Sequence, residues 1–338
     1  MDISSQKISI DSPELRTLGQ SDIQVSPVSL GCWPIAGVTT LGTNDEDSIA
    51  TIRKALECGV NHLDTAYCYG PSGESENLIR RALDLNPNVD RGNLTIATKC
   101  GIHYNADGNQ EQDARPETIR RECDESLRRL GVDHVELYYL HSPDPKLPLE
   151  DSAGAIAELV AAGKTRLAGA SNCQLDQLQT FHSICPLSVV QLPYNMLQRD
   201  IEQKTIPWCI ENRISTAIYW PLMKGLLAGK LPTDGKLAEG DNRLKYPMYQ
   251  GEEWQRNQEF VTRLTAIAEE AGKTVAQLVI NWTMRQQGIT TVLCGAKRPW
   301  QIEETAGAMG WELTEEQNKA IAAALAARGL AEANRRFE

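Results

Sequence analysis

The sequence has no long hydrophobic run and comparatively little positive charge. None of its apolar stretches approaches the roughly 18 residues that a membrane-spanning helix needs. We therefore expect no membrane association. The first residues lack the basic segment followed by an apolar segment that marks a secretory signal, so we expect no such signal either. Lys and Arg total 34 against 45 Asp and Glu, a net charge of −11. General nucleic-acid binding depends on a basic surface, so we do not expect it of this chain.

The sequence also lacks the cysteine spacing of a zinc site or a disulfide framework. Its nine cysteines are scattered, their number is odd, and there is no Cys-x-x-Cys pair. We therefore expect no metal site, and we expect reduced, mostly buried thiols in a cytoplasmic protein. The 41% hydrophobic and 23% charged content is that of an ordinary globular chain, which excludes disordered and fibrous architectures.

Short β-type runs alternate with longer helix-periodic segments along the chain. The runs are continuous in Val, Ile, Leu and Tyr and do not alternate with polar residues, which is typical of parallel strands buried on both faces. Eight strands are predicted in this way: Val25–Leu30, Val60–Leu63, Leu94–Thr98, Val135–Leu140, Thr165–Ala170, Ser188–Gln191, Ser215–Tyr219 and Thr290–Leu293.

Amphipathic segments fill the intervals between these strands. Pro116–Leu130 begins with a proline that a first helical turn tolerates, and it ends before Gly131, which can take a left-handed cap. The other predicted helices are Asp45–Glu57, Glu74–Leu85, Glu150–Ala162, Gln174–His182, Glu202–Asn212, Glu253–Glu270, Thr274–Gln287, Pro299–Ala308 and Thr314–Ala327. Repeated strand–helix units predict an α/β fold, a single-domain (β/α)8 TIM barrel with an N-terminal β-hairpin and extra C-terminal helices.

No linker rich in Gly, Ser or Pro divides the chain. We therefore predict one barrel domain over residues 15–330, with an N-terminal tail at 1–14 and a C-terminal tail at 331–338. The segment Leu231–Gly251 is too long for an ordinary barrel loop. We interpret it as a functional loop on the active face.

Titratable side chains follow three successive predicted strands. Asp64 follows Val60–Leu63, with Tyr69 in the adjoining loop, and Lys99 and His141 end the next two strands. A single residue of this kind is more often a turn former or a structural group. Barrel chemistry lies at the carboxyl ends of the strands, however, and the coincidence of these residues there favours one shared site.

Together these four side chains can protonate a substrate. They include neither a nucleophile paired with a base nor a cluster of metal ligands. An ordinary tyrosine has a pKa of about 10 and is protonated at neutral pH. We expect Lys99 to stabilise the phenolate of Tyr69 and so make it a better acid, with Asp64 paired to Lys99 and His141 orienting a carbonyl oxygen. The reducing equivalent must then come from elsewhere, and a nicotinamide cofactor supplies such chemistry.

From about Leu15 to Glu316 the chain resembles the aldo-keto reductases, and most closely the bacterial type that includes inositol-operon and general-stress reductases. The matching motifs agree in order and spacing: Asp64–Gly70, Lys99, Leu140-His141, Gly169–Asn172, Gln191–Asn195, Pro221–Leu227 and Gly295–Lys297. The resemblance implies NAD(P)H-dependent reduction of an aldehyde or ketone, or the reverse alcohol oxidation. By the same resemblance Asp64, Tyr69, Lys99 and His141 form the catalytic tetrad, with Tyr69 as acid and base.

The resemblance also assigns cofactor and substrate residues. Ser171, Asn172 and Gln191 would hold the nicotinamide carboxamide, and Tyr219 would stack on the nicotinamide ring. Pro221, Leu222, Lys224 and Leu226 would meet the pyrophosphate, and Gly295, Lys297, Arg298, Gln301, Glu304 and Thr305 fall at the adenosine end. Trp33 and Trp220 would wall a pocket for a small carbonyl or sugar substrate.

Two adjacent cations bear on the choice of cofactor. Lys297 and Arg298 lead into a predicted helix whose N-terminus also favours an anion, which fits the 2′-phosphate of NADPH. An arginine is often found in the family where Gln301 stands, and an asparagine where Thr305 stands. We predict NADPH as the preferred cofactor, with NADH as the second candidate.

Two other readings of the sequence remain open. Lys99 at a strand end also suits the Schiff-base lysine of a barrel aldolase, although that reading leaves Tyr69 and His141 unexplained. A nucleotide-binding regulatory subunit on the same fold is the other alternative. The sequence does not indicate the oligomeric state.

Overall fold

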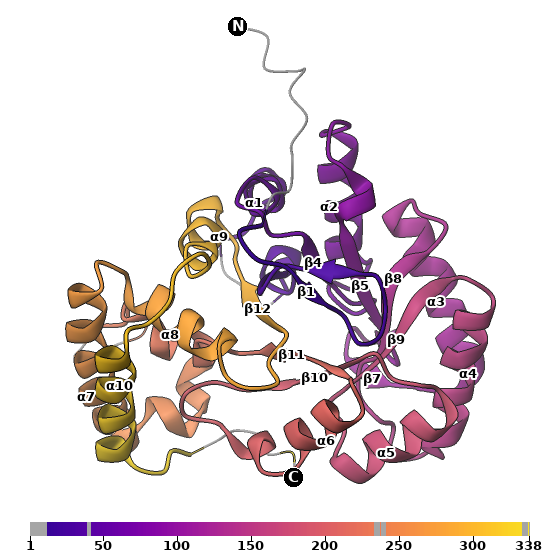
Figure 1. Ribbon diagram of the computed structural model, residues 1–338. Coiled ribbons are helices and arrows are strands. Elements are labelled where there is room, and N and C mark those ends of the chain that lie inside the picture. The colour runs from indigo at the N-terminus through magenta and orange to yellow at the C-terminus, as the bar shows by residue number, and fades with distance from the viewer. Residues whose placement is uncertain (1–11, 39–41, 233–236, 238–240, 333–336, 338) are drawn as a thin grey trace, which may run out of the picture.

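Eight parallel strands close into a barrel, and helices surround it (Figure 1). The computed structural model describes residues 12–38, 42–232, 237, 241–332 and 337. In order around the barrel, the strands are β3 (Val28–Gly31), β4 (His62–Asp64), β5 (Thr95–Cys100), β8 (Val135–Leu140), β9 (Thr165–Ser171), β10 (Val189–Pro193), β11 (Ser215–Tyr219) and β12 (Thr291–Gly295). Strand β12 pairs with β3 and closes the ring, so the predicted (β/α)8 fold is confirmed.

The helices follow the strands much as the periodicity predicts. They are α1 (Asp45–Glu57), α2 (Glu74–Asp84), α3 (Pro116–Leu130), α4 (Leu149–Ala161), α5 (Leu175–Ile184), α6 (Thr205–Glu211), α7 (Gly251–Glu270), α8 (Val275–Met284), α9 (Pro299–Ala306) and α10 (Glu315–Arg328). Gly131 caps α3 in the left-handed conformation, and Thr314 and Gln317 form a capping box that starts α10. The C-terminal helix α10 lies along α7 outside the barrel (Figure 1).

Helix α6 is shorter than predicted. It begins at Thr205 because Pro207 is tolerated only in the first turn of a helix. The residues Asp200–Glu202 form a separate 3-10 turn.

The N-terminal hairpin closes one end of the barrel. It consists of β1 (Arg16–Thr17) and β2 (Gln24–Val25), so the predicted strand Val25–Leu30 is in fact two strands separated around Pro27. Leu18, Ile23 and Val25 from the hairpin pack with side chains from inside the barrel. The backbone amide of Gly19 donates to Ser215 Oγ at the start of β11, so the hairpin covers the amino ends of the strands.

A second hairpin, absent from the sequence prediction, stands at the opposite end. Strands β6 (Ile102–Tyr104) and β7 (Gln110–Gln112) pair directly after β5. Their residues are mostly polar and partly or fully exposed, so they carry no apolar pattern to detect.

The long segment Leu231–Gly251 lies partly outside the described residues. Its described part forms 3-10 turns at Asn242–Lys245 and Pro247–Tyr249. The hydroxyl of Tyr249 donates to the carbonyls of Met223 and Lys224, which ties this segment to the stretch that follows β11.

The remaining features concern the ends of the chain and its thiols. Phe337 is buried, and its backbone amide donates to Asp200 Oδ2. The domain limits at residues 15 and 330 remain a prediction.

All nine cysteines are free thiols. Within the part of the chain that the structure describes, no helix is both long and apolar enough to cross a membrane, and no cluster of His, Cys, Asp or Glu suits a metal ion.

Candidate active site

A buried ion pair lies at the carboxyl ends of β4 and β5. Lys99 is fully buried, and its ammonium donates to Asp64 Oδ1 at 2.5 Å and to the carbonyl of Thr65 at 2.6 Å. Gln191 Nε2 donates to the other carboxylate oxygen, Asp64 Oδ2, at 2.8 Å. Both carboxylate oxygens and the ammonium therefore have partners, as a buried pair requires if it is to be stable.

Aromatic rings gather over this pair. The ring of Tyr69 forms T-shaped contacts with the rings of Trp33 and His141. The ring centroids are 5.0 Å apart in the first pair and 5.9 Å apart in the second. Lys99 Nζ lies 5.0 Å from the centroid of the Tyr69 ring. The structure thus brings together the four predicted tetrad residues and one of the two predicted substrate-wall tryptophans.

The environment of Tyr69 keeps its phenol protonated. Burial, and next the negative charge of Asp64, raise the pKa of Tyr69 well above its usual range. This is opposite to the direction predicted from Lys99 alone, because burial has the largest effect on the phenol and the negative charge of Asp64 adds to it. At neutral pH this hydroxyl is therefore a proton donor.

The residues predicted around the nicotinamide form one connected group. Asn172, at the end of β9, has a left-handed backbone with φ of 57°. Its side-chain amide donates to the carbonyl of His141 at 2.8 Å and to Ser171 Oγ at 3.1 Å, and its oxygen accepts from the hydroxyl of Tyr219 at 2.7 Å. Gln191 is buried on the neighbouring strand and joins this group to the ion pair through Asp64.

The stretch after β11 has an unusual backbone. Trp220, Met223 and Lys224 all have positive φ, at 59°, 45° and 57°, and Gly225 follows at 95°. Consecutive residues of this kind make turns whose amides suit anions. The ammonium of Lys224 lies 3.7 Å from the ring centroid of Trp220 and 4.6 Å from that of Tyr246.

This stretch is where a pyrophosphate is predicted. Pro221 and Leu226 are buried and Leu222 is partly buried, so they shape the turn mainly by packing. The left-handed backbone, together with the cation on Lys224, fits an anionic dinucleotide.

The loop after β12 is held by contacts that the sequence does not reveal. The Arg298 guanidinium forms an ion pair with Asp47 on α1 and donates to the carbonyl of Gly42 at 2.7 Å. The Gln301 side-chain oxygen accepts from the backbone amides of Lys297 and Arg298, at 2.9 and 3.1 Å. The Gln301 side chain therefore holds the loop in place by binding two of the loop's backbone amides.

The other residues predicted at the adenosine end are also engaged within the protein. Glu304 on α9 forms an ion pair of 2.5 Å with Lys230, whose ammonium also lies 4.6 Å from the Trp300 ring centroid. Thr305 is buried and bonds to a carbonyl of its own helix, whereas Gly295 is exposed at the end of β12. Sequence reasoning missed Lys230 and Trp300, since a loop lysine and an exposed tryptophan carry no pattern.

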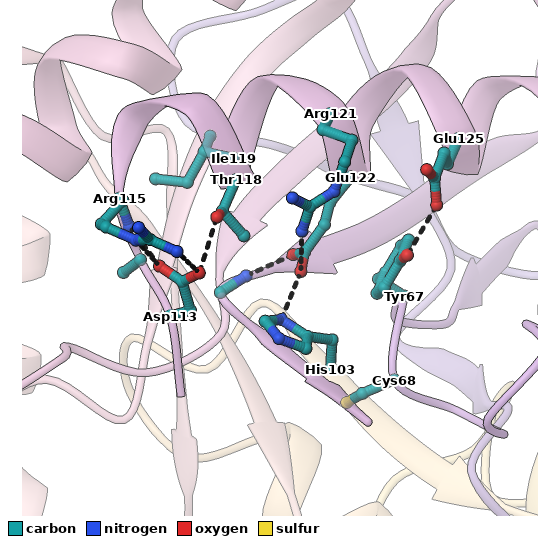
Figure 2. A network of polar contacts seen from close by, with 12 residues as sticks. Tyr67, Cys68, His103, Asp113, Arg115, Thr118, Ile119, Arg121, Glu122 and Glu125 are labelled. Atoms are coloured by element: carbon teal, nitrogen blue, oxygen red, sulfur yellow. Dashed lines mark hydrogen bonds and ion pairs between the residues drawn. The ribbon is translucent and has the colours of Figure 1, made fainter. Parts of the chain in front are cut away.

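A buried carboxyl anchors the second hairpin to α3 (Figure 2). Glu122 is fully buried, accepts from the backbone amide of Gly101 at 2.7 Å, and lies 3.0 Å from His103 Nδ1 at the base of β6. Burial raises the pKa of Glu122 to about 8 and outweighs the opposing hydrogen bond from Gly101. On the same helix, Glu125 accepts from the hydroxyl of Tyr67 (Figure 2). Glu122 lies three residues after Ile119 and next to Cys123, so the helical spacing could have placed it on the buried face of α3.

Comparison with known proteins decides the family. The model of the Aldo/keto reductase family matches residues 27–326. The chain belongs to this family. It is similar to the aldo-keto reductase YhdN of Bacillus subtilis, with 34% identity over 91% of this chain and 92% of the relative. It is also similar to the NADH-specific methylglyoxal reductase of Escherichia coli, with 30% identity over 88% of this chain and 94% of the relative.

Solved structures agree with this assignment. A glycerol dehydrogenase from Gluconobacter oxydans aligns with a TM-score of 0.87 and 32% identity, covering 97% of this chain and all of the other. The holo form of an aldo-keto reductase from Bacillus halodurans aligns with a TM-score of 0.77 and 25% identity over 96% and 99% of the two chains. As an aldo-keto reductase, this protein is an oxidoreductase of carbonyl and alcohol groups, in a family that uses a nicotinamide cofactor.

Proposed function

We propose that this aldo-keto reductase reduces an aldehyde or ketone with Tyr69 as the proton donor. The observation that carries the proposal is the position of the Tyr69 phenol, which has the ring of His141 and the ammonium of Lys99 beside it. Burial raises the pKa of this phenol, so it keeps its proton at neutral pH. A bound nicotinamide supplies the hydride that the carbonyl carbon accepts. Tyr69 gives its hydroxyl proton to the carbonyl oxygen and accepts a proton back from the alcohol in the reverse direction.

The buried ion pair serves this proton transfer. When Tyr69 loses its proton, the Lys99 ammonium stabilises the phenolate that forms. Asp64 holds the Lys99 ammonium beside the Tyr69 ring through the buried ion pair. His141 donates a hydrogen bond to the carbonyl oxygen and so orients the substrate.

The cofactor residues follow the same arrangement. Ser171, Asn172 and Gln191 would hold the nicotinamide carboxamide, and the ring of Tyr219 would stack on the nicotinamide. Pro221, Leu222, Lys224 and Leu226 would hold the pyrophosphate. Gly295, Lys297, Arg298, Gln301, Glu304 and Thr305 would hold the adenosine end.

NADPH is the cofactor that we propose, because Lys297 and Arg298 supply two cations for a 2′-phosphate at the start of α9. Asp47 opposes this preference, since its ion pair with Arg298 must loosen before the guanidinium can bind a phosphate. The relative from Escherichia coli is NADH-specific by its name, so the choice rests on this chain's own loop.

The substrate that we propose is a small carbonyl compound or sugar. Trp33 packs on Tyr69, and Trp220 packs on Tyr219. We propose that these two indoles wall the space for the substrate. The names of two relatives, a methylglyoxal reductase and a glycerol dehydrogenase, point to small, oxygen-rich molecules. The free thiols support a cytoplasmic location.

Replacement of the phenol tests the proposal. Tyr69→Phe removes the donor with little change of volume, so turnover of a generic aldehyde should fall by at least about 10²-fold. Binding of NADPH, followed by fluorescence titration, should stay near that of the wild type. Tyr67→Phe is the matched control, because that hydroxyl donates to Glu125 at 2.6 Å, and it should keep turnover within a few-fold. Full turnover in Tyr69→Phe would overturn the proposal.

The contacts of Lys99 argue against a Schiff-base enzyme. A Schiff-base lysine needs a neutral amine that a carbonyl can reach. Lys99 is fully buried and paired with Asp64. A regulatory subunit without activity predicts no turnover in the wild type, and the same assay decides that question.

A further inference from the structure

The residue before the proposed acid touches the proposed orienting histidine. Cys68 is 2% exposed, and its Sγ lies 3.5 Å from Nδ1 of His141. The contact joins the loop after β4 to the end of β8, two segments that also bring Tyr69 and His141 together.

The chemistry of a neutral imidazole gives this contact a consequence. One ring nitrogen carries the proton and donates a hydrogen bond, while the other accepts one. The hydrogen-bond partner of one nitrogen therefore decides whether the other nitrogen is protonated. A thiol is only a weak hydrogen-bond acceptor, whereas an unprotonated imidazole nitrogen is a good one. The favoured arrangement therefore has the S–H of Cys68 donating to Nδ1 of His141.

We propose that Cys68 is a positioning residue that selects the tautomer of His141. With Nδ1 occupied as an acceptor, the ring proton lies on Nε2, and Nε2 is the nitrogen that donates to the carbonyl oxygen. The inference rests on the proposed function, because it gives His141 the donor role stated above.

Two further features support the assignment. Burial raises the pKa of Cys68 to about 12, against the opposing charge of Lys99, so the thiol keeps its proton at neutral pH. The backbone of His141 is held on both sides, since its amide donates to the carbonyl of Cys100 at 3.0 Å and its carbonyl accepts from Asn172 at 2.8 Å. With the main chain fixed, a contact to the ring bears directly on its orientation.

The tautomer can be measured without any assay of activity. The chain has five histidines, so long-range ¹H–¹⁵N spectra of histidine-labelled protein are simple, and His141→Asn identifies the signals of His141. In the wild type, with and without NADP⁺, we expect an unprotonated Nδ1 and a protonated Nε2. In Cys68→Val, which removes the donor, we expect the two signals to move toward a mixture of tautomers.

Kinetics then connect the tautomer to the reaction. Catalytic efficiency in Cys68→Val should fall about three- to tenfold, the range that loss of one neutral hydrogen bond gives, with NADPH affinity unchanged. Cys68→Ser keeps a donor and should restore both the Nε2–H signal and most of the efficiency. Cys209→Val, a buried cysteine on α6, controls for the loss of a core thiol and should leave both readouts unchanged.

The outcomes separate this inference from the proposed function. A wild-type tautomer with Nδ1 protonated, or an unchanged tautomer in Cys68→Val, overturns the role of Cys68 even if His141→Asn is inactive. Full efficiency in His141→Asn would instead remove the donor role of His141, and with it the catalytic part of the inference. A shifted tautomer with reduced efficiency in Cys68→Val, rescued by Cys68→Ser, supports it.

Discussion

At the scale of single residues, the site depends on charges that are buried only because they are paired. Lys99 and Asp64 lie in the interior with their polar atoms bonded to each other, to Thr65 and to Gln191. Removing one partner leaves the other as an uncompensated buried charge, which costs far more than a surface ion pair is worth. The same pair therefore contributes to stability and to catalysis.

Lys99→Met should show both losses together. We expect a fall in turnover and a fall of about 3–5 kcal/mol in the free energy of unfolding, because Asp64 is then left unpaired. Chemical denaturation beside steady-state kinetics measures the two effects. Lys164→Met is the matched control, since its ion pair with Asp124 is exposed and is worth about 0–1 kcal/mol. A Lys99→Met protein of unchanged stability and activity would contradict the assignment.

The adenosine end gives a second prediction at this scale. The double variant Lys297→Ala/Arg298→Ala should weaken NADPH at least about tenfold more than NADH, because only NADPH carries the 2′-phosphate. Asp47→Asn should act in the opposite direction and favour NADPH a few-fold, since it releases Arg298. Dissociation constants for both cofactors decide the matter. Equal weakening of NADPH and NADH in the double variant would show that these cations do not read the phosphate.

At the scale of elements, the hairpin formed by β6 and β7 depends on one buried carboxyl. Glu122 holds the amide of Gly101 and the ring of His103, so it fixes the point where the chain leaves β5 just after Lys99. Arg121 lies at the edge of this group, 4.0 Å from Glu122. A protonated Glu122 donates to His103, whereas an ionised Glu122 is a poorly solvated charge in the interior.

This anchor predicts a dependence of stability on pH. The pKa of Glu122 is raised to about 8 in the folded protein and is near 4.5 in the unfolded chain, so the folded state holds an extra proton between these values. Stability from this group is therefore greatest below about pH 4.5 and decreases as the pH rises to about 8. Glu122→Gln should remove that decrease, as thermal unfolding across this range would show. An identical pH profile in wild type and variant would refute the assignment.

The hairpins also mark the limits of sequence reasoning. The barrel strands could be predicted because they are continuous apolar runs, and most helices because their apolar residues recur with a helical period. The strand predicted at Val25–Leu30 is two strands, because local hydrophobicity does not reveal that Val25 pairs with Arg16. Strands β6 and β7 are too short and too polar to predict.

Some contacts of the candidate site could likewise be predicted from the sequence, and others could not. Asp64, Lys99 and His141 could be placed together because parallel strands end at one edge of a barrel. The ion pairs of Arg298 with Asp47 and of Glu304 with Lys230 could not be foreseen. Each joins residues far apart in the sequence through side chains whose positions depend on packing.

At the scale of the whole molecule, the two ends of the barrel have different contents. The hairpin of β1 and β2 fills the amino end with Leu18, Ile23 and Val25, which pack on Tyr139 and Ala217 inside the barrel. The ion pair and the aromatic rings occupy the carboxyl end. The barrel interior between them is filled by buried side chains.

Leu18→Ala should therefore destabilise the protein without reaching the chemistry. Leu18 is fully buried, and a leucine-to-alanine change in a core costs about 2–5 kcal/mol. Turnover per folded molecule should stay at the wild-type value, because the substitution lies at the far end of the barrel. Leu15→Ala, at a largely exposed leucine just before β1, is the control and should change stability little. A loss of turnover in fully folded Leu18→Ala would show that the hairpin of β1 and β2, which plugs the amino end of the barrel, is coupled to the active site.

The hairpin plug has a consequence for how this enzyme can change over time. Mutations that alter specificity tend to be destabilising, and a reserve of stability allows a protein to tolerate them. Here such a reserve can be built at the amino end, by improving the packing around Leu18 and Ile23, without touching a group that handles the substrate or cofactor. The carboxyl end is then free to vary in its walls, Trp33 and Trp220, around an unchanged proton donor. Directed evolution toward new carbonyl substrates would do well to begin from a variant with a reinforced plug.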